Sequence, residues 1–426
     1  MKYKDIVTFI RTLFPDKDFI PLHEPYFAGN EKKYLADCID TTFVSSVGKY
    51  VDRFEEMIRE YTGAKYAIAT VNGTAALHIA LLLAGVQPGD LVITQPLTFI
   101  ATCNAISYCG AKPVFMDVDS DTMGMSPEAL ESWLTQNVDV LSLDSFELEH
   151  VQPDAAFSTG RSPLNRAQPT QQDEVRSTRR SPRPSSTIAI HKTLRRPISA
   201  CVPMHTFGHP CRIDKIVGIC TRYHIPVVED SAESLGSYYK DKHTGTFGKL
   251  GILSFNGNKT ITTGGGGMVL TDDDDLGPLA KHITTTAKKP HPWKFEHDMV
   301  GYNYRLPNVN AALGCAQMEM LDAILANKRE TAMRYQEFFA GITDIQYQPE
   351  PPETISNYWL NAILLKDHIQ QELFLKETNA NKVMTRPAWI LMNELVMFKG
   401  SLTADLTVSK EIASRLVNIP SSYKTQ

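Results

Sequence analysis

The chain has 426 residues, of which 42% are hydrophobic and 21% are charged, and its formal net charge is −5. A chain of this length is expected to form more than one domain around a sizeable core. So small a net charge does not favour nucleic acid or an acidic membrane surface as a partner.

The seven cysteines contain no CxxC pair, so we expect buried, reduced thiols, no disulfide framework and no metal site. The first residues mix charged and apolar side chains, and no apolar run is long enough to cross a bilayer. We therefore expect a cytoplasmic protein without a signal peptide.

Helical and strand patterns alternate from about residue 53 onward. Apolar residues predict helices over 53–61, 75–83 and 213–223. Short apolar runs between turn residues predict seven strands, at 65–71, 91–94, 113–117, 198–204, 225–229, 251–255 and 267–270. This alternation predicts an α/β domain with a mainly parallel sheet, in which ligands bind beyond the carboxyl ends of the strands.

The character of the chain changes after about residue 285. Residues 308–339 are strongly helical, and the remainder mixes short strands with helices, as a smaller second domain would. We therefore expect an N-terminal segment over residues 1–30, a large domain over 31–284 and a small C-terminal domain over 285–426.

One segment does not fit this frame. Residues 138–193 are rich in Ser, Arg, Pro, Gln and Thr and have no apolar periodicity, which is typical of disorder. We expect a disordered surface insertion there, with a local error in the sequence as a second explanation. The third explanation is that the Arg/Ser run binds RNA or has a regulatory role.

Polar side chains suited to chemistry follow several predicted strands. Lys259 comes just after a strand and just before four consecutive glycines, where backbone approaches a ligand closely. A turn lysine beside a flexible loop explains the same pattern. Asp230 ends the run Ile225-Pro-Val-Val-Glu-Asp, where a strand presents a carboxylate at its carboxyl end. Capping of a following helix is the alternative.

Three further positions lie at strand ends. Gly73 and Thr74 open the apolar helix 75–83 and offer backbone N–H groups and a hydroxyl to a phosphate, to which Ser254 adds a second hydroxyl. Ordinary helix capping is the competing explanation. Phe99 follows a strand and offers a flat ring, although a lone Phe is more often a core residue.

These side chains together match the needs of pyridoxal phosphate (PLP). That cofactor requires a lysine for a Schiff base, an anion for its pyridine nitrogen, phosphate ligands and an aromatic partner. Such sites are often completed by a second subunit, for which the polar stretch 301–305 is a candidate. Each signal is weak alone, but their order on one α/β frame favours a PLP site.

At this point the chain resembles the DegT/DnrJ/StrS family of PLP-dependent nucleotide-sugar aminotransferases, except over 138–193. The matching stretches are Asn72-Gly-Thr-Ala-Ala-Leu, Thr98-Phe-Ile-Ala-Thr, Gly110-Ala-Lys-Pro-Val-Phe-Met-Asp-Val-Asp, Val228-Glu-Asp-Ser-Ala-Glu, Ser254-Phe-Asn-Gly-Asn-Lys and Gly301-Tyr-Asn-Tyr-Arg-Leu-Pro-Asn. Within the family it resembles most the branch of bacillosamine and legionaminic-acid type pathways. Stretches such as Pro21-Leu-His-Glu-Pro, Val202-Pro-Met-His-Thr-Phe-Gly-His-Pro and Thr385-Arg-Pro-Ala-Trp carry that second likeness.

The resemblance implies a fold-type I architecture, with a large mixed, mostly parallel sheet and a smaller C-terminal α/β domain. It also implies roles for the residues above. Lys259 would hold PLP as a Schiff base, and Asp230 would pair with the pyridine nitrogen. Gly73, Thr74 and Ser254 would bind the phosphate. Phe99 would cover the ring.

The resemblance assigns further residues to the site. Asn303 would reach the phosphate from the neighbouring subunit, which implies a homodimer with shared active sites. Glu233 would lie near the cofactor, where relatives often carry Gln or His. Ser46, His205 and Arg386 would lie near the sugar nucleotide.

The function implied is transfer of an amino group from L-glutamate to the 4-keto group of a nucleotide-linked 4-keto-6-deoxy sugar. A UDP-linked 2-acetamido sugar is the expected substrate, in bacterial surface-glycan or nonulosonic-acid biosynthesis. Two alternatives remain open. The first is another PLP reaction on a nucleotide sugar, such as 3-amino transfer or dehydration, although the retained Lys259 favours amino transfer because dehydrating relatives have His there. The second is a non-catalytic regulator that keeps the fold.

Overall fold

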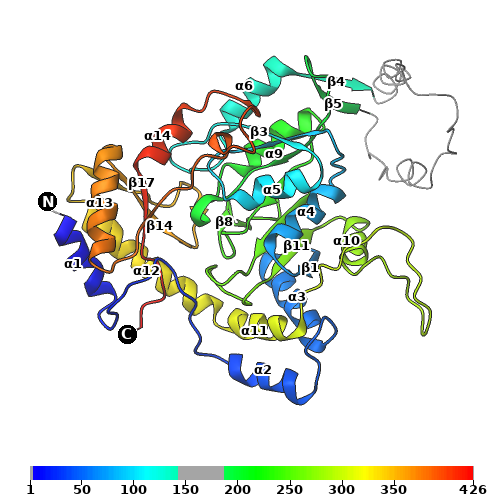
Figure 1. Cartoon of the computed structure of the whole chain (residues 1–426), viewed down its shortest axis with the longest axis horizontal. Helices are drawn as coiled ribbons and strands as arrows, with labels where there is room; N and C mark the ends of the chain where they lie inside the picture. Colours follow the sequence, from blue (N-terminus) through cyan, green and yellow to red (C-terminus); the bar gives the residue numbers. More distant parts are fainter. Residues whose placement is uncertain (1–2, 143–186, 426) are drawn as a thin grey trace, which may run out of the picture.

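The computed structural model of the chain describes residues 3–142 and 187–425. A broad α/β part and a smaller part lie side by side, with both chain termini at the smaller part (Figure 1). All seven cysteines are buried and none is in a disulfide, as the sequence analysis predicts.

The larger part is built on two hydrogen-bonded sheets that continue into one another. One has the strand order β1-β11-β10-β7 and the other β16-β3-β2-β6. Parallel bridges from Cys201 to Val227 and from Met204 to Asp230 join β6 to β7. Only β11 runs antiparallel to its neighbours. The strands are β1 (Tyr66–Thr70), β2 (Leu91–Thr94), β3 (Lys112–Phe115), β6 (Ile198–Val202), β7 (Val228–Asp230), β10 (Leu250–Ser254), β11 (Gly267–Thr271) and β16 (Leu402–Thr403).

Helices cover both faces of this sheet, which explains why its central strands are apolar along their whole length. β2 (LVIT) and β11 (GMVLT) are buried at every residue, as expected for strands covered on both faces. The covering helices are α3 (Lys49–Thr62), α4 (Gly73–Leu83), α5 (Ile100–Tyr108), α6 (Pro127–Asn137), α9 (Ile213–Arg222), α10 (Leu276–Thr284) and α11 (Asn308–Glu319).

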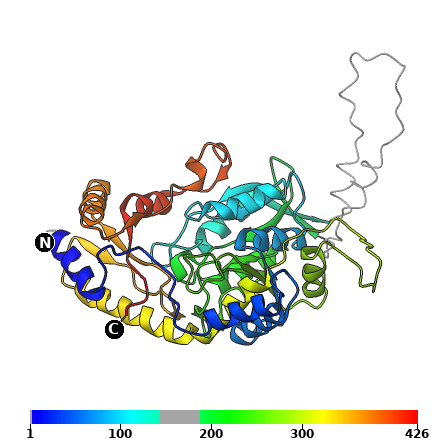
Figure 2. The ribbon, with the colours of Figure 1, turned by 60° about the horizontal axis from the view of Figure 1, so that its bottom comes forward.

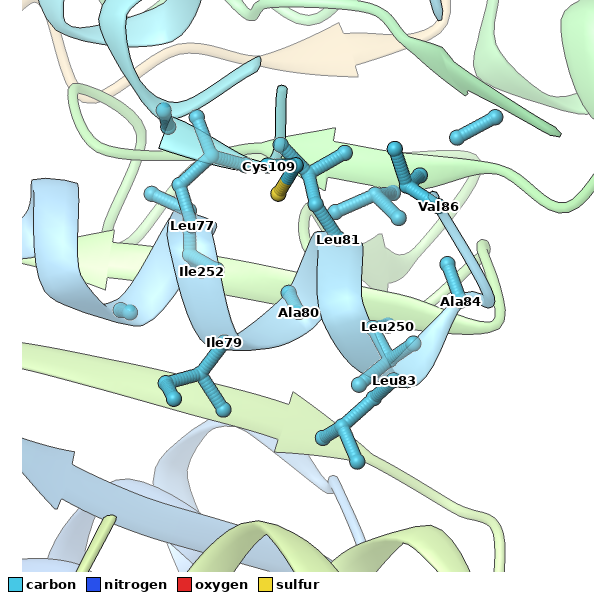
Figure 3. Packing of buried hydrophobic residues seen from close by; sticks show 14 of the residues in the cluster. Leu77, Ile79, Ala80, Leu81, Leu83, Ala84, Val86, Cys109, Leu250 and Ile252 are labelled. Atoms are coloured by element: carbon cyan, nitrogen blue, oxygen red, sulfur yellow. The ribbon is translucent and has the colours of Figure 1, made fainter. Parts of the chain in front are cut away.

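Helix α4 is apolar around its whole circumference because it is enclosed by other elements. It contacts α5, α10, β10 and β11. Leu77, Ala80 and Leu81 of this helix belong to one buried core cluster with Leu250 and Ile252 of β10, and Figure 3 shows this cluster around the helix. The N-terminus of this helix is therefore held rigidly above the sheet.

The smaller part is a second, antiparallel sheet with its own helices. Its strand order is β12-β14-β17-β15, with β12 (Ile345–Tyr347), β14 (Asn361–Leu365), β15 (Arg386–Pro387) and β17 (Leu416–Ile419). The helices of this part are α12 (Leu321–Phe339), α13 (His368–Ala380), α14 (Thr407–Arg415) and the N-terminal α1 (Tyr3–Leu13). α1 packs against α13 and shares an apolar core with α12 and β14, so the first residues of the chain complete the part that holds its last ones.

Several elements connect the two parts. α11 packs against α3 and α2 (Glu31–Asp40) of the larger part, whereas α12 packs against β12 of the smaller part. Figure 2 shows α11 and α12 running along one side of the molecule from the larger to the smaller part. β16, from residues 402–403, pairs in parallel with β3 at the edge of the large sheet. A small sheet of β8 (Tyr238–Tyr239), β9 (Lys242–His243) and β13 (Thr354–Ile355) also joins the parts. Two short 3-10 helices, η1 (Thr206–Gly208) and η2 (Met392–Glu394), complete the described elements.

The helical stretch predicted over 308–339 is confirmed at both ends and divides at Met320 into α11 and α12. The structure corrects two other predictions. The strand predicted from Ile225 begins at Val228, because Pro226 has no N–H to donate. The predicted disorder over 138–193 is wrong at its two ends. β4 (Val138–Ser142) and β5 (Thr187–His191) form an antiparallel pair in which Ile188, Ala189 and Ile190 are buried. Residues 143–186 lie outside the described residues.

Candidate active site

The parallel strands of the large sheet end at one edge, and a cavity of about 310 Å³ lies there. β1, β2, β6, β7 and β10 each lead into a loop that contributes to its lining. Seven predicted site residues line this cavity: Gly73, Thr74, Phe99, Asp230, Glu233, Ser254 and Lys259. The small part adds Trp359 and Trp389. The site therefore lies where the topology of an open α/β sheet predicts it.

Asp230 is held in one orientation at the end of β7. The hydroxyl of Thr102, in the first turn of α5, donates to its Oδ2 at 2.7 Å, and the N–H of Ala232 donates to its Oδ1 at 3.2 Å. Thr98 extends this network through a hydroxyl–hydroxyl hydrogen bond of 2.8 Å to Thr102. No helix begins at residue 231, so Asp230 is not the helix cap that the sequence left as an alternative.

The N-terminus of α4 faces the cavity and approaches β10 closely. Asn72 caps the helix, since its side chain accepts from the N–H of Ala75 at 2.8 Å. A Cβ at Gly73 would lie 2.8 Å from the Cβ of Ser254, so only glycine allows this approach. The first N–H groups of a helix have no partner within the helix, so Gly73, Thr74 and the Ser254 hydroxyl form a cradle suited to an anion.

Lys259 projects into the cavity from the turn after β10. Its Nζ lies 3.2 Å from Oε1 of Glu233 and 4.1 Å from the ring centroid of Trp359. The lysine side chain is 12% exposed, so it is not the solvated turn lysine of the alternative explanation. A buried amine with one carboxylate partner and an aromatic wall is placed to act on a ligand in the cavity.

Glu233 is almost completely buried beside that amine. Burial raises the pKa of Glu233 to about 7, although Lys259 and the backbone N–H of Phe207 act in the opposite direction. That N–H donates to Oε2 at 2.9 Å. Phe207 has a φ of 57°, an uncommon conformation for a bulky residue, and the bond to Glu233 helps to hold it. Glu233 can therefore hold a proton near neutral pH next to Lys259.

Two aromatic side chains mark the open side of the cavity. Phe99 is 49% exposed, which excludes the core role that its sequence left open. Its ring centroid lies 6.4 Å from that of Trp389, whose indole also packs at 5.0 Å against Phe207. The exposed face of Phe99 is available to a flat ligand.

Three of the remaining predicted residues lie outside this lining. Ser46 is half-buried in the connection between α2 and α3. Asn303 is exposed, and its Oδ1 accepts from Arg305 Nε at 3.1 Å. Arg386 is exposed on β15, where it donates to the side-chain oxygen of Asn379 at 3.0 Å.

His205 is the fourth predicted residue that does not line the cavity. It is fully buried, and its Nε2 lies 3.0 Å from Oε2 of Glu229 while its Nδ1 accepts the N–H of Cys211. Its two ring nitrogens are thus engaged by Glu229 and Cys211 within the protein interior.

The sequence analysis missed four residues that the structure places at the site. Thr102 was part of a family motif, and its spacing of four from Thr98 on a helix start was the available signal. Asn258 precedes the lysine, and its carbonyl accepts from Trp359 Nε1 at 2.6 Å. No pattern near the lysine marked Trp359, which comes from a distant part of the chain, and Trp389 was the last residue of the family stretch Thr385-Arg-Pro-Ala-Trp but was given no role.

These residues fit PLP. The cradle at Gly73 that a Cβ would fill suits its phosphate, the fixed carboxylate of Asp230 suits its ring nitrogen, and the partly exposed Phe99 suits its ring. The fold and the site together define a fold-type I PLP-dependent aminotransferase.

Comparison with known proteins shows to which family of aminotransferases the chain belongs. The family model of the DegT/DnrJ/EryC1/StrS aminotransferases matches residues 25–141 and 186–426. The chain belongs to this family and is a PLP-dependent sugar aminotransferase. The match is interrupted between residues 141 and 186, inside the segment that the sequence sets apart.

Individual relatives extend over nearly the whole chain. A GDP-perosamine synthase of Escherichia coli O157:H7 is 32% identical over 95% of this chain and 93% of its own. One from Caulobacter vibrioides is 30% identical over 94% of this chain and 92% of its own. Helicobacter pylori PseC, an aminotransferase involved in the biosynthesis of pseudoaminic acid, has a similar structure, with a TM-score of 0.75 and 20% identity over 94% of this chain and 93% of its own.

In the part of the chain that the structure describes, no helix combines the length and the apolar character that crossing a membrane requires.

Proposed function

We propose that this protein transfers an amino group from L-glutamate to the 4-keto group of a nucleotide-linked 4-keto-6-deoxy sugar. The observation that carries this proposal is the buried amine of Lys259, which lies 3.2 Å from Glu233 in the cavity that Asp230 and the α4 N-terminus also line. The names of the relatives from Escherichia coli and Caulobacter, which are nucleotide-sugar enzymes, support the substrate class.

The roles of the residues follow from their positions. PLP, when bound, supplies an aldehyde for the amino group and a ring that accepts electrons. The Nζ of Lys259 takes a proton from the amino-bearing carbon of the donor and later returns one to the sugar carbon. Asp230, held by Thr102, would stabilise positive charge on the ring nitrogen of the bound cofactor. Glu233 accepts or returns the proton that Lys259 Nζ carries, which suits a carboxyl with a pKa of about 7.

The proposal also concerns which nucleotide and which sugar make up the substrate. A UDP-linked 2-acetamido sugar is our first expectation, on the resemblance of Pro21-Leu-His-Glu-Pro and Thr385-Arg-Pro-Ala-Trp to one branch of the family. A GDP-linked 4-keto-6-deoxy sugar is the second candidate, because the relatives at 30–32% identity are named GDP-perosamine synthases. The open side of the cavity, at Phe99 and Trp389, is where the nucleotide would enter.

A second copy of the chain is part of the proposal. Asn303 is exposed and points its side-chain oxygen toward Arg305 rather than into its own cavity. We place it at the phosphate cradle of the partner in a homodimer with shared active sites. Ser46 and Arg386, which are not fully buried, remain candidate contacts of the sugar nucleotide.

The test has two stages. Purified protein is loaded with PLP, reduced with borohydride and digested, and the modified peptide should carry the cofactor on Lys259, whereas Lys259→Ala should carry none. The protein is then given nitrogen-15 L-glutamate with either a UDP-linked or a GDP-linked 4-keto-6-deoxy sugar. Nitrogen-15 bonded to carbon 4 of one sugar, seen by NMR, is the expected result.

Other outcomes decide between the alternatives. Nitrogen at carbon 3 or loss of water from the sugar would replace 4-amino transfer with another PLP reaction. Reduction that labels no lysine, together with no transfer to either substrate, would favour a regulator that keeps the fold.

A further inference from the structure

Lys328 is a buried lysine that no step of the proposed reaction uses. It lies on α12 with 1% of its surface exposed. Its Nζ donates to three backbone carbonyls, those of Tyr358 at 3.4 Å, Trp359 at 3.2 Å and Ser421 at 2.7 Å. Burial lowers the pKa of Lys328 to about 7. An ammonium group is costly to bury, so the carbonyls that surround it must be held close to it.

The backbone that these carbonyls belong to has an uncommon conformation. Tyr358 has a φ of 46°, in the left-handed region that bulky residues avoid. Its N–H donates to the hydroxyl of Ser356 at 3.1 Å, and the N–H of Trp359 donates to the side-chain oxygen of Asn357 at 2.8 Å. The side chains of Ser356 and Asn357 thus hold the N–H groups of this turn, and Lys328 holds its carbonyls. Such a conformation persists only where the surroundings fix it.

This turn carries the indole that forms one wall of the site. The ring centroid of Trp359 lies 4.1 Å from Lys259 Nζ, and its Nε1 donates to the carbonyl of Asn258 at 2.6 Å. The indole therefore touches both the reactive amine and the backbone of the residue before it. A chain of direct contacts leads from the Nζ of Lys328 through the Trp359 backbone and ring to Lys259.

We propose that Lys328 is a positioning residue for amino transfer, which acts through the turn at Tyr358 and Trp359 to hold the indole against Lys259. This inference rests on the proposed function, because it assigns a role toward the same lysine. Lys328 itself does not line the cavity. Without its ammonium group the two carbonyls lose their shared donor, the indole is free to shift, and Lys259 loses a defined position.

Loss of position has a measurable effect on a group that must reach a reacting atom. A displacement of about 1 Å can lower a rate by about a hundredfold, because fewer encounters have the required geometry. Phe99 and Trp389, the proposed substrate contacts, lie on other loops of the cavity. The effect should therefore fall on kcat and on the rate at which Lys259 captures PLP, and KM should change little.

The experiment is a double-mutant cycle on the full chain. Lys328→Met keeps the length of the side chain but removes the charge and the donors, and Trp359→Phe keeps a ring but removes the hydrogen bond to Asn258. The matched control is Lys424→Met, which removes a lysine that pairs with Glu330 on the same helix at 2.6 Å. For each variant we would measure the thermal midpoint, kcat and KM, and the rate at which visible absorbance rises when apoprotein is mixed with PLP.

The expected result is a drop of about tenfold or more in kcat and in the capture rate for Lys328→Met and for Trp359→Phe, with KM within about threefold. In the Trp359→Phe background, Lys328→Met should lower either rate by less than about threefold further, because both act through one path. Lys424→Met should leave both rates unchanged.

The proposal is overturned if Lys328→Met lowers only the thermal midpoint, or if the two effects multiply in the double variant. If Lys328→Met does not fold, the Trp359→Phe variant tests the proposal instead. An unchanged kcat and capture rate in Trp359→Phe would show that the indole does not position Lys259, and the proposal would be overturned. The capture rate does not require a sugar nucleotide. A wild type that captures PLP but aminates neither substrate would therefore contradict the proposed function and leave this test intact.

Discussion

Replacing Glu233 by glutamine should change how the stability of the apoprotein depends on pH. Glu233 is 2% exposed, and burial raises its pKa from 4.5 to about 7. In the folded state it therefore holds a proton more tightly than in the unfolded state. The stability that this gives is fully present below pH 4.5 and is lost as the pH rises through 7.

The size of the effect follows from the two pKa values. The difference between 4.5 and about 7 corresponds to about 3 kcal/mol, at about 1.4 kcal/mol for each pH unit. Glutamine has nearly the same shape and cannot lose a proton in this range. The free energy of unfolding of Glu233→Gln should therefore rise relative to that of the wild type by about 3 kcal/mol between pH 4.5 and 7.

Urea unfolding of both apoproteins across that pH range measures the difference directly. Taking the difference at each pH cancels the titration of every other carboxylate. Glu337→Gln, on an exposed position of α12, is the matched control for removal of one carboxylate. A difference between Glu233→Gln and the wild type that stays constant to within about 0.5 kcal/mol from the lowest to the highest pH would refute the assignment of a proton to Glu233.

Three other substitutions test separate parts of the site. Gly73→Ala places a Cβ 2.8 Å from the Cβ of Ser254, so the Kd for PLP, measured by fluorescence titration, should rise at least about tenfold. An unchanged Kd would mean that the cradle does not bind phosphate. Thr102→Val removes the hydroxyl bond to Asp230 and should lower kcat about tenfold with little effect on the thermal midpoint, and an unaltered kcat would contradict that role. Gly208→Ala would put a Cβ 1.9 Å from the side-chain oxygen of a buried asparagine, at a φ of +93°. Chemical denaturation should show a loss of about 2 kcal/mol or more, and wild-type stability would count against this packing.

The strands of the large sheet were predictable because their signals are local. The strand predicted at Leu91–Thr94 is confirmed at both ends, since an apolar run between Asp90 and Pro96 leaves little choice of boundary. The ordered ribbon at 138–142 was missed because its partner residues, 187–191, lie beyond a long polar stretch, and because Val140 is exposed and gives the strand no apolar pattern. The break at Met320 depends on what α11 and α12 pack against, which periodicity along one helix does not reveal.

The site residues on the large sheet were also predictable, because their sequence signals are local. Lys259, Asp230 and Gly73 each lie at or just after the carboxyl end of a strand of one mixed sheet, so local pattern and topology bring them together. His205 follows β6, but it is fully buried with both ring nitrogens bonded to protein groups, whereas its neighbour Met204 lines the cavity, and no pattern along the chain marks that difference. Trp359 enters from another part of the chain, and no pattern near Lys259 anticipates it.

The pairing of β16 with β3 has a consequence for the order in which the protein forms on the ribosome. β3 is complete at residue 115, but the strand that covers its outer edge is residues 402–403. Until nearly the whole chain has been translated, the backbone groups along that edge have no strand to pair with. An unpaired edge of an apolar sheet is the kind of surface on which nascent chains associate. This edge of β3 can therefore be covered by its neighbouring strand only after residue 403 has been synthesised.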